Sequence, residues 1–135
     1  MRKIIVIADD LTGATNAASY FAENCKDIPV FIDSNSIAKK ELDFLKKHDV
    51  IIFNTNTRTA GKDPAQLSVK RLCGLISGFG EIILVKKIDT AFRGNVAAEL
   101  DAILTTTERK FCFIISAIPS MNRITIGGFQ IIEGK

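Results

Sequence analysis

The stretch Ile4–Asn16, with the sequence IIVIADDLTGATN, decides how the rest of the chain folds. Its first five residues are apolar without alternation, which is typical of a strand covered on both faces, as in a parallel α/β sheet. Two adjacent acids, Asp9 and Asp10, follow, and small residues suited to a closely packed helix come after Gly13. Open α/β sheets bind their ligands at such junctions of strand and helix. Helix capping accounts for one of the two acids but not for both.

Length and composition indicate one globular domain. The chain has 135 residues, of which 47% are hydrophobic and 24% charged, so a packed core is expected. No apolar run approaches the roughly 20 residues of a membrane helix, and a net charge of +3 is too small to indicate a nucleic-acid partner. We therefore expect neither a membrane nor a nucleic-acid partner. A small anionic ligand is compatible with this charge.

Cysteine and histidine usage argues against a metal site and a histidine base. Cys25, Cys73 and Cys112 are far apart and lack metal-ligand spacing, so we expect buried thiols in a reducing cytoplasm and no metal. The single histidine, His48, lies beside lysines before a strand, which is typical of a solvated helix end. A histidine-based catalytic triad is therefore not expected.

Apolar strand patterns alternate with helical patterns along the chain. This order predicts an α/β fold: a mostly parallel sheet with helices on both faces, doubly wound and Rossmann-like, in three layers. Asp63 followed by Pro64 predicts a helix with Asp63 as its N-cap. The segment 124–135 resembles a hairpin that lacks its second half. The expected neighbouring strands are Ile4–Ala8, Val30–Ile32, Val50–Phe53, Ile82–Val85 and Phe111–Ile115.

Polar loops follow four of these strands and are expected to meet at one edge, because parallel strands end on the same side of a sheet. They combine acids with Arg58, Arg93, Arg123 and two lysines, a mixture suited to a small polyhydroxy anion. The alternatives are an Asp89–Arg93 surface ion pair and a solvated Arg58, which would contribute little to stability. The four loops are Asp9–Gly13, Asn54–Arg58, Lys86–Asn95 and Pro119–Arg123.

Standard nucleotide motifs are missing from the sequence. Neither GxGxxG nor GxxxxGK[ST] occurs, so no nucleotide site of either type is supported. A strand ending in Asp-Asp-Leu-Thr-Gly also resembles the haloacid-dehalogenase-like phosphatases, in which an Asp at the strand end is the nucleophile. Those enzymes use Asp-x-Asp, and Thr12 occupies the second position after Asp10. A phosphatase and a non-catalytic sugar-acid-binding module therefore stand as alternative functions.

Four motifs carry a more specific resemblance: ADDLTGATNAA, NTNTR, KKIDTAFRGNVAAELDAIL and AIPSMNRITIGG. Together they resemble the N-terminal, sugar-acid-binding domain of the four-carbon acid sugar kinase family, over nearly the whole chain. The resemblance implies that residues 1–135 form the substrate-binding domain of an ATP-dependent kinase for threonate, erythronate or 3-oxo-tetronate. It also implies that the C-terminal nucleotide-binding domain of that family is absent, so this chain alone is expected to be inactive.

The resemblance assigns roles by position. It implies that a rim aspartate orients or deprotonates the attacking hydroxyl, while cations bind the carboxylate of the sugar acid. The catalytic candidates are Asp9, Asp10 and Asp89. The substrate-binding candidates are Asp9, Asp10, Thr12, Gly13, Arg58, Lys86, Lys87, Asp89, Thr90 and Arg93.

Cofactors are implied only for the complete enzyme. ATP and magnesium would arrive with the nucleotide-binding domain, in cis or from a partner chain, and none is expected in this chain. Two departures from the family pattern leave the sugar acid unspecified. Asn16 stands where an acid is frequent, and residues 89–93 read Asp-Thr-Ala-Phe-Arg instead of Asp-Ser-Thr-Leu-Arg, with the loss of one hydroxyl. A cytoplasmic location is expected.

Overall fold

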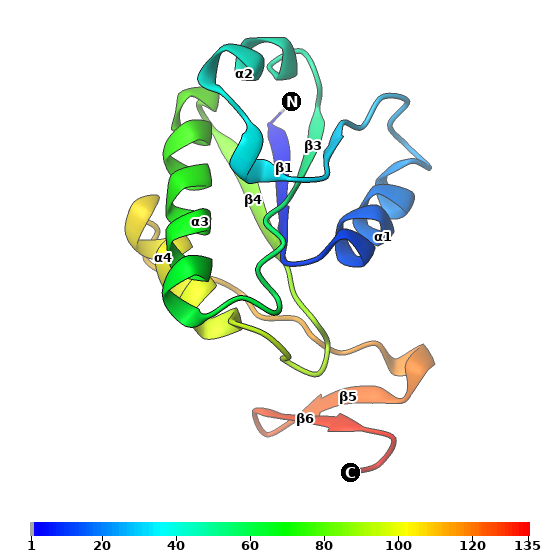
Figure 1. Ribbon diagram of the computed structural model, residues 1–135. Helices are drawn as coiled ribbons and strands as arrows, with labels where there is room; N and C mark the ends of the chain where they lie inside the picture. The colour runs from blue at the N-terminus through cyan, green and yellow to red at the C-terminus, as the bar shows by residue number, and fades with distance from the viewer. Residues whose placement is uncertain (1) are drawn as a thin grey trace.

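A four-stranded parallel sheet forms the centre of the computed structural model, which describes residues 2–135 (Figure 1). The strand order is β2-β3-β1-β4, and every neighbouring pair is parallel. This arrangement confirms the predicted α/β class. The strands are β1 (Lys3–Ala8), β2 (Val30–Phe31), β3 (Val50–Asn54) and β4 (Ile82–Lys87).

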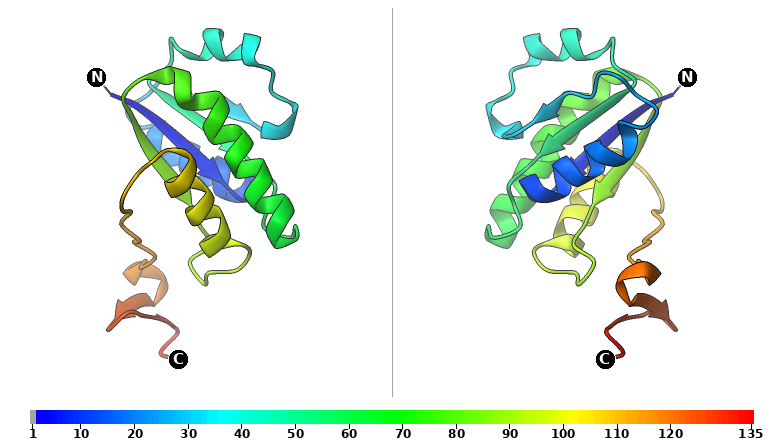
Figure 2. Two further views of the ribbon diagram at one scale, coloured as in Figure 1. Left: turned by 90° about the vertical axis from the view of Figure 1, so that its left-hand side faces the viewer. Right: turned by 90° about the vertical axis from the view of Figure 1, so that its right-hand side faces the viewer.

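Helices cover both faces of this sheet (Figures 1 and 2). α1 (Leu11–Phe21) packs on one face, while α3 (Lys62–Ile76) and α4 (Val96–Thr106) pack on the other, with α2 (Lys39–Leu45) against the far end of α3. The three layers agree with the sequence prediction. None of the described helices is long and apolar enough to cross a membrane.

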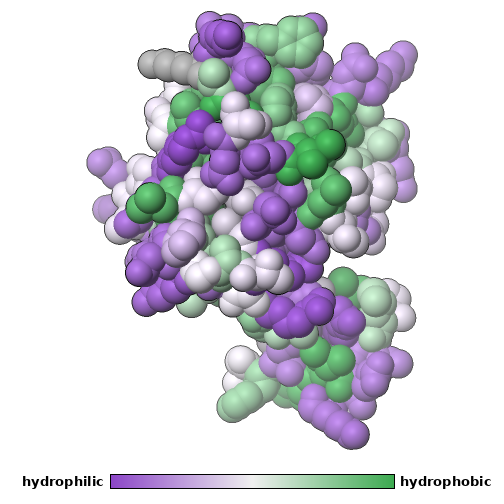
Figure 3. Space-filling model, in the orientation of Figure 1, coloured by the Kyte–Doolittle hydropathy of each residue, from purple (hydrophilic) through white to green (hydrophobic). Residues whose placement is uncertain are grey.

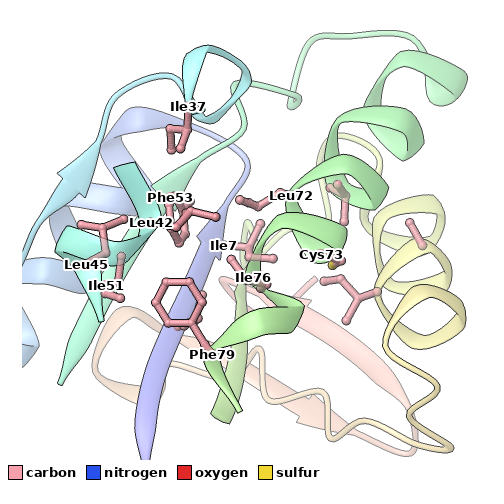
Figure 4. Close-up of a cluster of buried hydrophobic side chains, with 14 residues drawn as sticks. Ile7, Ile37, Leu42, Leu45, Ile51, Phe53, Leu72, Cys73, Ile76 and Phe79 are labelled. Atoms are coloured by element: carbon pink, nitrogen blue, oxygen red, sulfur yellow. The ribbon is translucent and has the colours of Figure 1, made fainter. Parts of the chain in front are cut away.

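Both faces of the central strands are buried, which explains their unalternating sequences. Ile7 and Phe53 point toward α3, where they meet Leu72 and Ile76 (Figure 4). Val6, Ala8 and Ile52 point the other way, against small residues of α1. Since Ala14 and Ala17 carry short side chains, α1 lies close to the sheet, and the loop that joins β1 to α1 is correspondingly tight.

Of the two helix starts expected from the sequence, one is confirmed and one is wrong. The N-cap of α1 is Asp10, whose side chain accepts a hydrogen bond of 2.7 Å from the Gly13 N–H, so one of the two acids does cap the helix. The N-cap of α3 is Gly61, and the prediction of Asp63 is wrong. The helix begins before Asp63, which lies with Pro64 in the first turn, where a negative charge and a missing N–H are both tolerated.

The expected fifth strand, Phe111–Ile115, is not formed, and that prediction is wrong. The neighbouring β4 leaves Ile83 and Val85 exposed, and neither belongs to the apolar cluster that α1 forms with the sheet. A strand beside β4 would therefore lie outside the apolar layer on that face. Phe113 is accordingly 85% exposed.

The chain ends in an antiparallel hairpin of β5 (Arg123–Ile126) and β6 (Phe129–Ile132), preceded by the short 3₁₀ turn η3 (Pro119–Met121). Both strands are present, so the expectation of a half hairpin is wrong. Gly127 and Gly128 join them with positive φ angles of 58° and 84°, as a tight type I′ turn requires. The hairpin lies beyond the carboxyl ends of the sheet strands, as a lower lobe with apolar patches (Figures 1 to 3).

Candidate functional site

Five charged side chains gather at the carboxyl edge of the sheet, in the loops after β1, β3 and β4. We call them the rim cluster. They come from segments that lie far apart in the sequence, and the parallel strands bring them to the same edge, as predicted. The members are Asp9, Asp10, Arg58, Asp89 and Arg93.

Arg58 is bound by both acids of the first loop. Its Nε and Nη2 donate to the two carboxylate oxygens of Asp9 at 2.9 and 2.8 Å, and its Nη1 donates to Asp10. The Asp9 side chain is 2% exposed and that of Arg58 is 20% exposed. Arg58 is therefore a structural clamp on the two acids rather than a solvated cation. Asp9, with both oxygens occupied, is not placed as a free nucleophile of the phosphatase type.

The charges of the rim cluster influence one another across the three loops. The pKa of Arg58 is raised, first by its hydrogen bond to Asp9, and further by the charges of Asp9, Asp10 and Asp89, against the opposing effect of burial. The pKa of Arg93 is raised in the same way, chiefly by its hydrogen bond to Asp89, with contributions from Asp10 and Asp9. All three carboxylates therefore raise the pKa of each guanidinium.

Asp89 and Arg93, both predicted to bind substrate, form inside the β4–α4 loop the ion pair that the sequence offered as the alternative to that role. Arg93 donates from Nη2 to Oδ1 at 2.6 Å and from Nε to Oδ2 at 3.0 Å, while backbone N–H groups of Ala91 and Arg93 also donate to Oδ2. The pKa of Asp89 is lowered well below its ordinary value, mainly by the Arg93 side chain. Because the Arg93 side chain is 70% exposed, it keeps donors directed at solvent.

A close backbone approach joins the Arg58 loop to the β4–α4 loop. Gly94 has a φ of 86°, and a Cβ there would lie 3.1 Å from the Arg58 carbonyl oxygen. The Asn95 side chain then donates to the carbonyls of Thr57 and Ala60 at 3.0 and 2.9 Å. Both features require the residue types found here, since glycine tolerates this φ and Asn95 supplies two donors.

The two adjacent lysines of β4 point to opposite faces of the sheet, as successive strand residues do. Lys86 points toward α4, where its Nζ lies 2.6 Å from Glu99 with both side chains buried. Lys87 lies toward α1, where a Cβ on Gly13 would be 3.4 Å from its Cγ, and its Nζ donates to the Ile88 carbonyl at 2.9 Å. Both were predicted to bind substrate, but the structure places Lys86 beneath the rim and Lys87 beside the start of α1.

The remaining predicted residues border the rim cluster. Thr12 is exposed in the first turn of α1, and Gly13 donates its N–H to Asp10. The Thr90 hydroxyl accepts a hydrogen bond from Arg123, so the fourth predicted loop does reach the third.

One polar residue beneath the rim, Glu99, was not predicted. Glu99 is fully buried and bonded to Lys86 and Thr57. A signal for Glu99 did exist: it lies three residues after Val96 and four before Ile103, on the apolar face of the helix. An acid on such a face needs a buried partner.

Two cavities adjoin this edge of the molecule. One, of about 510 Å³, lies between the start of α4 and Ile114, and the other, of about 410 Å³, lies between β4 and the Phe111–Ile115 segment. Their linings are mainly apolar, and neither includes a member of the rim cluster. The rim cluster thus lies outside both of these cavities.

Magnesium and nucleotide do not fit the described side chains. Each rim carboxylate is already paired with a guanidinium, and residues 2–135 contain no group of three acids, histidines or cysteines spaced to hold a metal. The loop between β1 and α1 consists of Asp9 and Asp10, without glycine or lysine, and Gly13 already lies in the first turn of α1, so this is not a phosphate-cradling loop.

Comparison with known proteins places this arrangement in a family. A family model described as a sugar-binding N-terminal domain matches residues 4–135. The chain is 30% identical to a D-threonate kinase of Salmonella typhimurium and 28% identical to a D-erythronate kinase of Heliobacterium modesticaldum, covering 98% of this chain and 30% of each relative. A 3-oxo-tetronate kinase of Salmonella typhimurium is 27% identical, with 98% and 31% covered. The chain thus spans about three-tenths of the length of these relatives.

A solved structure shares the fold. It is a domain of unknown function from Bordetella bronchiseptica, crystallised with bound citrate as a domain-swapped dimer. The TM-score is 0.67 at 24% identity, over 76% of this chain and 25% of that one. The family match covers almost all of the chain and confirms the resemblance drawn from its motifs. The chain belongs to the family of sugar-binding N-terminal domains.

Proposed function

We propose that this chain binds a four-carbon sugar acid as the substrate-holding part of an ATP-dependent kinase. The family match and the names of three relatives support this function. The observation that carries the proposal is the rim cluster, in which acids and cations from three loops are held together at the carboxyl edge of a parallel sheet. Ligands of open α/β sheets bind at that edge.

Lys87 and Arg93 are the cations best placed for the carboxylate of the acid. Arg58 already donates three hydrogen bonds to Asp9 and Asp10, whereas the Lys87 ammonium has a single backbone carbonyl as its partner and Arg93 is largely exposed. The positive end of the α1 dipole, next to Lys87, favours the same anion.

Asp10 is the acid best placed for the hydroxyl that accepts phosphate. All three carboxylates have hydrogen-bond partners, and the two oxygens of Asp10 accept from the Gly13 N–H and from Arg58. The Asp10 side chain is nevertheless 24% exposed, whereas those of Asp9 and Asp89 are 2% and 8% exposed. We assign Asp10 the task of orienting or deprotonating that hydroxyl. Arg58 would hold Asp10 in place, since phosphoryl transfer depends mainly on positioning and electrostatic stabilisation.

ATP and magnesium are assigned to residues outside the rim cluster. Because the rim carboxylates are paired and no phosphate-cradling loop follows β1, these loops fit the acid rather than the nucleotide. The nucleotide would come from a further domain, in cis or from a partner chain.

Titration calorimetry tests the proposal. D-Threonate and D-erythronate should bind the wild-type chain, whereas threitol and erythritol, which lack the carboxylate, should bind at least tenfold more weakly. Lys87→Ala should lower the affinity for the acid about tenfold or more, because it removes a charge-assisted hydrogen bond of about 1.5–3 kcal/mol. Lys70→Ala, an exposed lysine on α3, is the matched control and should change nothing. Equal affinity for acid and polyol, or no binding, would overturn the proposal.

A further inference from the structure

We infer that Glu99 is a positioning residue of the sugar-acid site, which orients Arg58 from beneath the rim by way of Thr57. The ligand-binding part of this inference rests on the proposed function. The orientation of Arg58 is a property of the free protein and is tested separately.

Glu99 holds two side chains at once in a buried layer. Its Oε2 lies 2.6 Å from Lys86 Nζ, and its Oε1 accepts a hydrogen bond from the Thr57 hydroxyl. The side chains of Glu99 and Lys86 are 1% and 5% exposed. The Thr55 hydroxyl extends the layer, at 2.8 Å from that of Thr57 and 2.9 Å from the Ala8 carbonyl oxygen. The ends of β1, β3 and β4 are thus joined below the site.

Thr57 connects this layer to Arg58. The N–H groups of Thr57 and Arg58 both donate to the Asp9 carbonyl oxygen, at 2.9 and 3.1 Å, and Asn95 donates to the Thr57 carbonyl. The Thr57 side chain is fixed by Glu99, and the next residue in the chain carries the guanidinium that clamps Asp9 and Asp10. A change in the orientation of Thr57 therefore moves the clamp.

The chemistry of this layer points to positioning rather than to stability. Replacing a buried ion pair by well-packed apolar residues of similar volume is frequently neutral or stabilising, so a buried Lys86–Glu99 pair is a poor way to stabilise a core. A carboxylate that binds an ammonium and a hydroxyl together does, however, fix the direction of both, which apolar packing cannot do. Glu99 lies below the rim and makes no contact with a ligand bound above it.

The test uses matched variants of the full chain. Thr57→Val removes the hydroxyl but leaves the Lys86–Glu99 pair intact, while Thr57→Ser keeps the hydroxyl. Glu99→Gln removes the charge. Asp101→Asn makes the equivalent change at an exposed acid on the same helix and serves as the control. The Asp101 carboxylate accepts a hydrogen bond from the Gln66 side chain, away from the rim cluster.

The first measurement needs no ligand. The Nε–H of Arg58, which is bonded to the buried Asp9 carboxylate, should exchange slowly with solvent in the wild type, as followed by proton–nitrogen NMR. We expect exchange about tenfold faster in Thr57→Val and Glu99→Gln, and unchanged in Thr57→Ser and Asp101→Asn. The affinity for D-threonate should fall about tenfold in the first two variants and stay the same in the others.

Two results separate the inference from the proposed function. If Arg58 exchange and the affinity of folded Thr57→Val both equal those of the wild type, the positioning role is refuted, even where Glu99→Gln fails to fold. If the wild type binds no sugar acid while Arg58 exchange responds as expected, the proposed function fails and the positioning of Arg58 stands.

Discussion

Replacing Arg58 by alanine should destabilise the fold far more than the loss of an exposed arginine would. The substitution removes both hydrogen bonds to Asp9 and the one to Asp10. The Asp9 carboxylate, 2% exposed, would then be left buried without a charged partner. An uncompensated buried charge is among the few causes of a large loss of stability from a single substitution.

The magnitude follows from the burial of the pair. Removal of one partner of a buried ion pair costs about 3–5 kcal/mol, and the 20% exposure of Arg58 indicates the lower end, about 3 kcal/mol. That is a large part of the roughly 5–15 kcal/mol that stabilises a typical domain. For a chain of this size it corresponds to a fall in Tm of roughly 10 °C.

Urea denaturation followed by circular dichroism measures this loss directly. Arg2→Ala is the matched control, because Arg2 pairs with Glu81 at 3.1 Å on the surface, and its loss should cost less than about 1 kcal/mol. The double variant Arg58→Met with Asp9→Asn should regain part of the lost stability, since it leaves no charge at the fully buried position 9, while Asp10, which also loses Arg58, is 24% exposed. If Arg58→Ala and Arg2→Ala lower the free energy of unfolding by the same amount, Arg58 is not a clamp on a buried acid and the reasoning is refuted.

Three further predictions concern the loops and the thiols. The folded-state pKa of Asp89 lies below its ordinary value of 3.8, so its carboxylate stabilises the fold above that pH, and the stability difference between wild type and Asp89→Asn should shrink as the pH falls below about 4; a difference independent of pH would contradict this. Gly94→Ala should destabilise by about 1–3 kcal/mol because of its φ of 86° and the nearby Arg58 carbonyl, whereas Gly74→Ala, in open space within α3, should stabilise by up to about 1 kcal/mol in the same melts. A thiol reagent at pH 8 should label the exposed Cys112 quickly and Cys73 only on unfolding, because burial raises the pKa of Cys73 to about 11; protection of Cys112 would show that its segment is docked as a strand.

The sheet was predictable because its information is local. Unbroken apolar runs such as Ile4–Ala8 and Val50–Phe53 are typical of strands buried on both faces, and both formed where expected. Phe111–Ile115 is an equally apolar run, but it forms no strand and its side chains are largely exposed. Whether a helix covers such a run depends on the tertiary packing, which the run's own residues do not show. An apolar run is therefore necessary for a strand buried in the sheet, but it does not ensure that a helix covers that strand.

The membership of the site was predicted better than the partners of its members. Topology brought Asp10, Arg58 and Asp89 to one edge, as the sequence indicated. The sequence could not show that Arg58 faces two acids at once, because that depends on the loop geometry set by Gly94 and Asn95. The alternation of strand residues, in contrast, is sufficient to separate Lys86 from Lys87, because successive side chains of a strand point to opposite faces of the sheet.

Chemical-shift mapping of the ¹⁵N-labelled chain with D-threonate tests the sugar-acid site most directly. At saturation, the backbone amides that shift most should lie in the segments 10–13 and 86–95, on both sides of Lys87, and threitol at the same concentration should shift them clearly less. The amides of 111–115, beside the apolar cavity, serve as the internal control and should not move. Shifts centred on that segment, or none at saturating acid, would contradict the assignment of the rim cluster as the sugar-acid site.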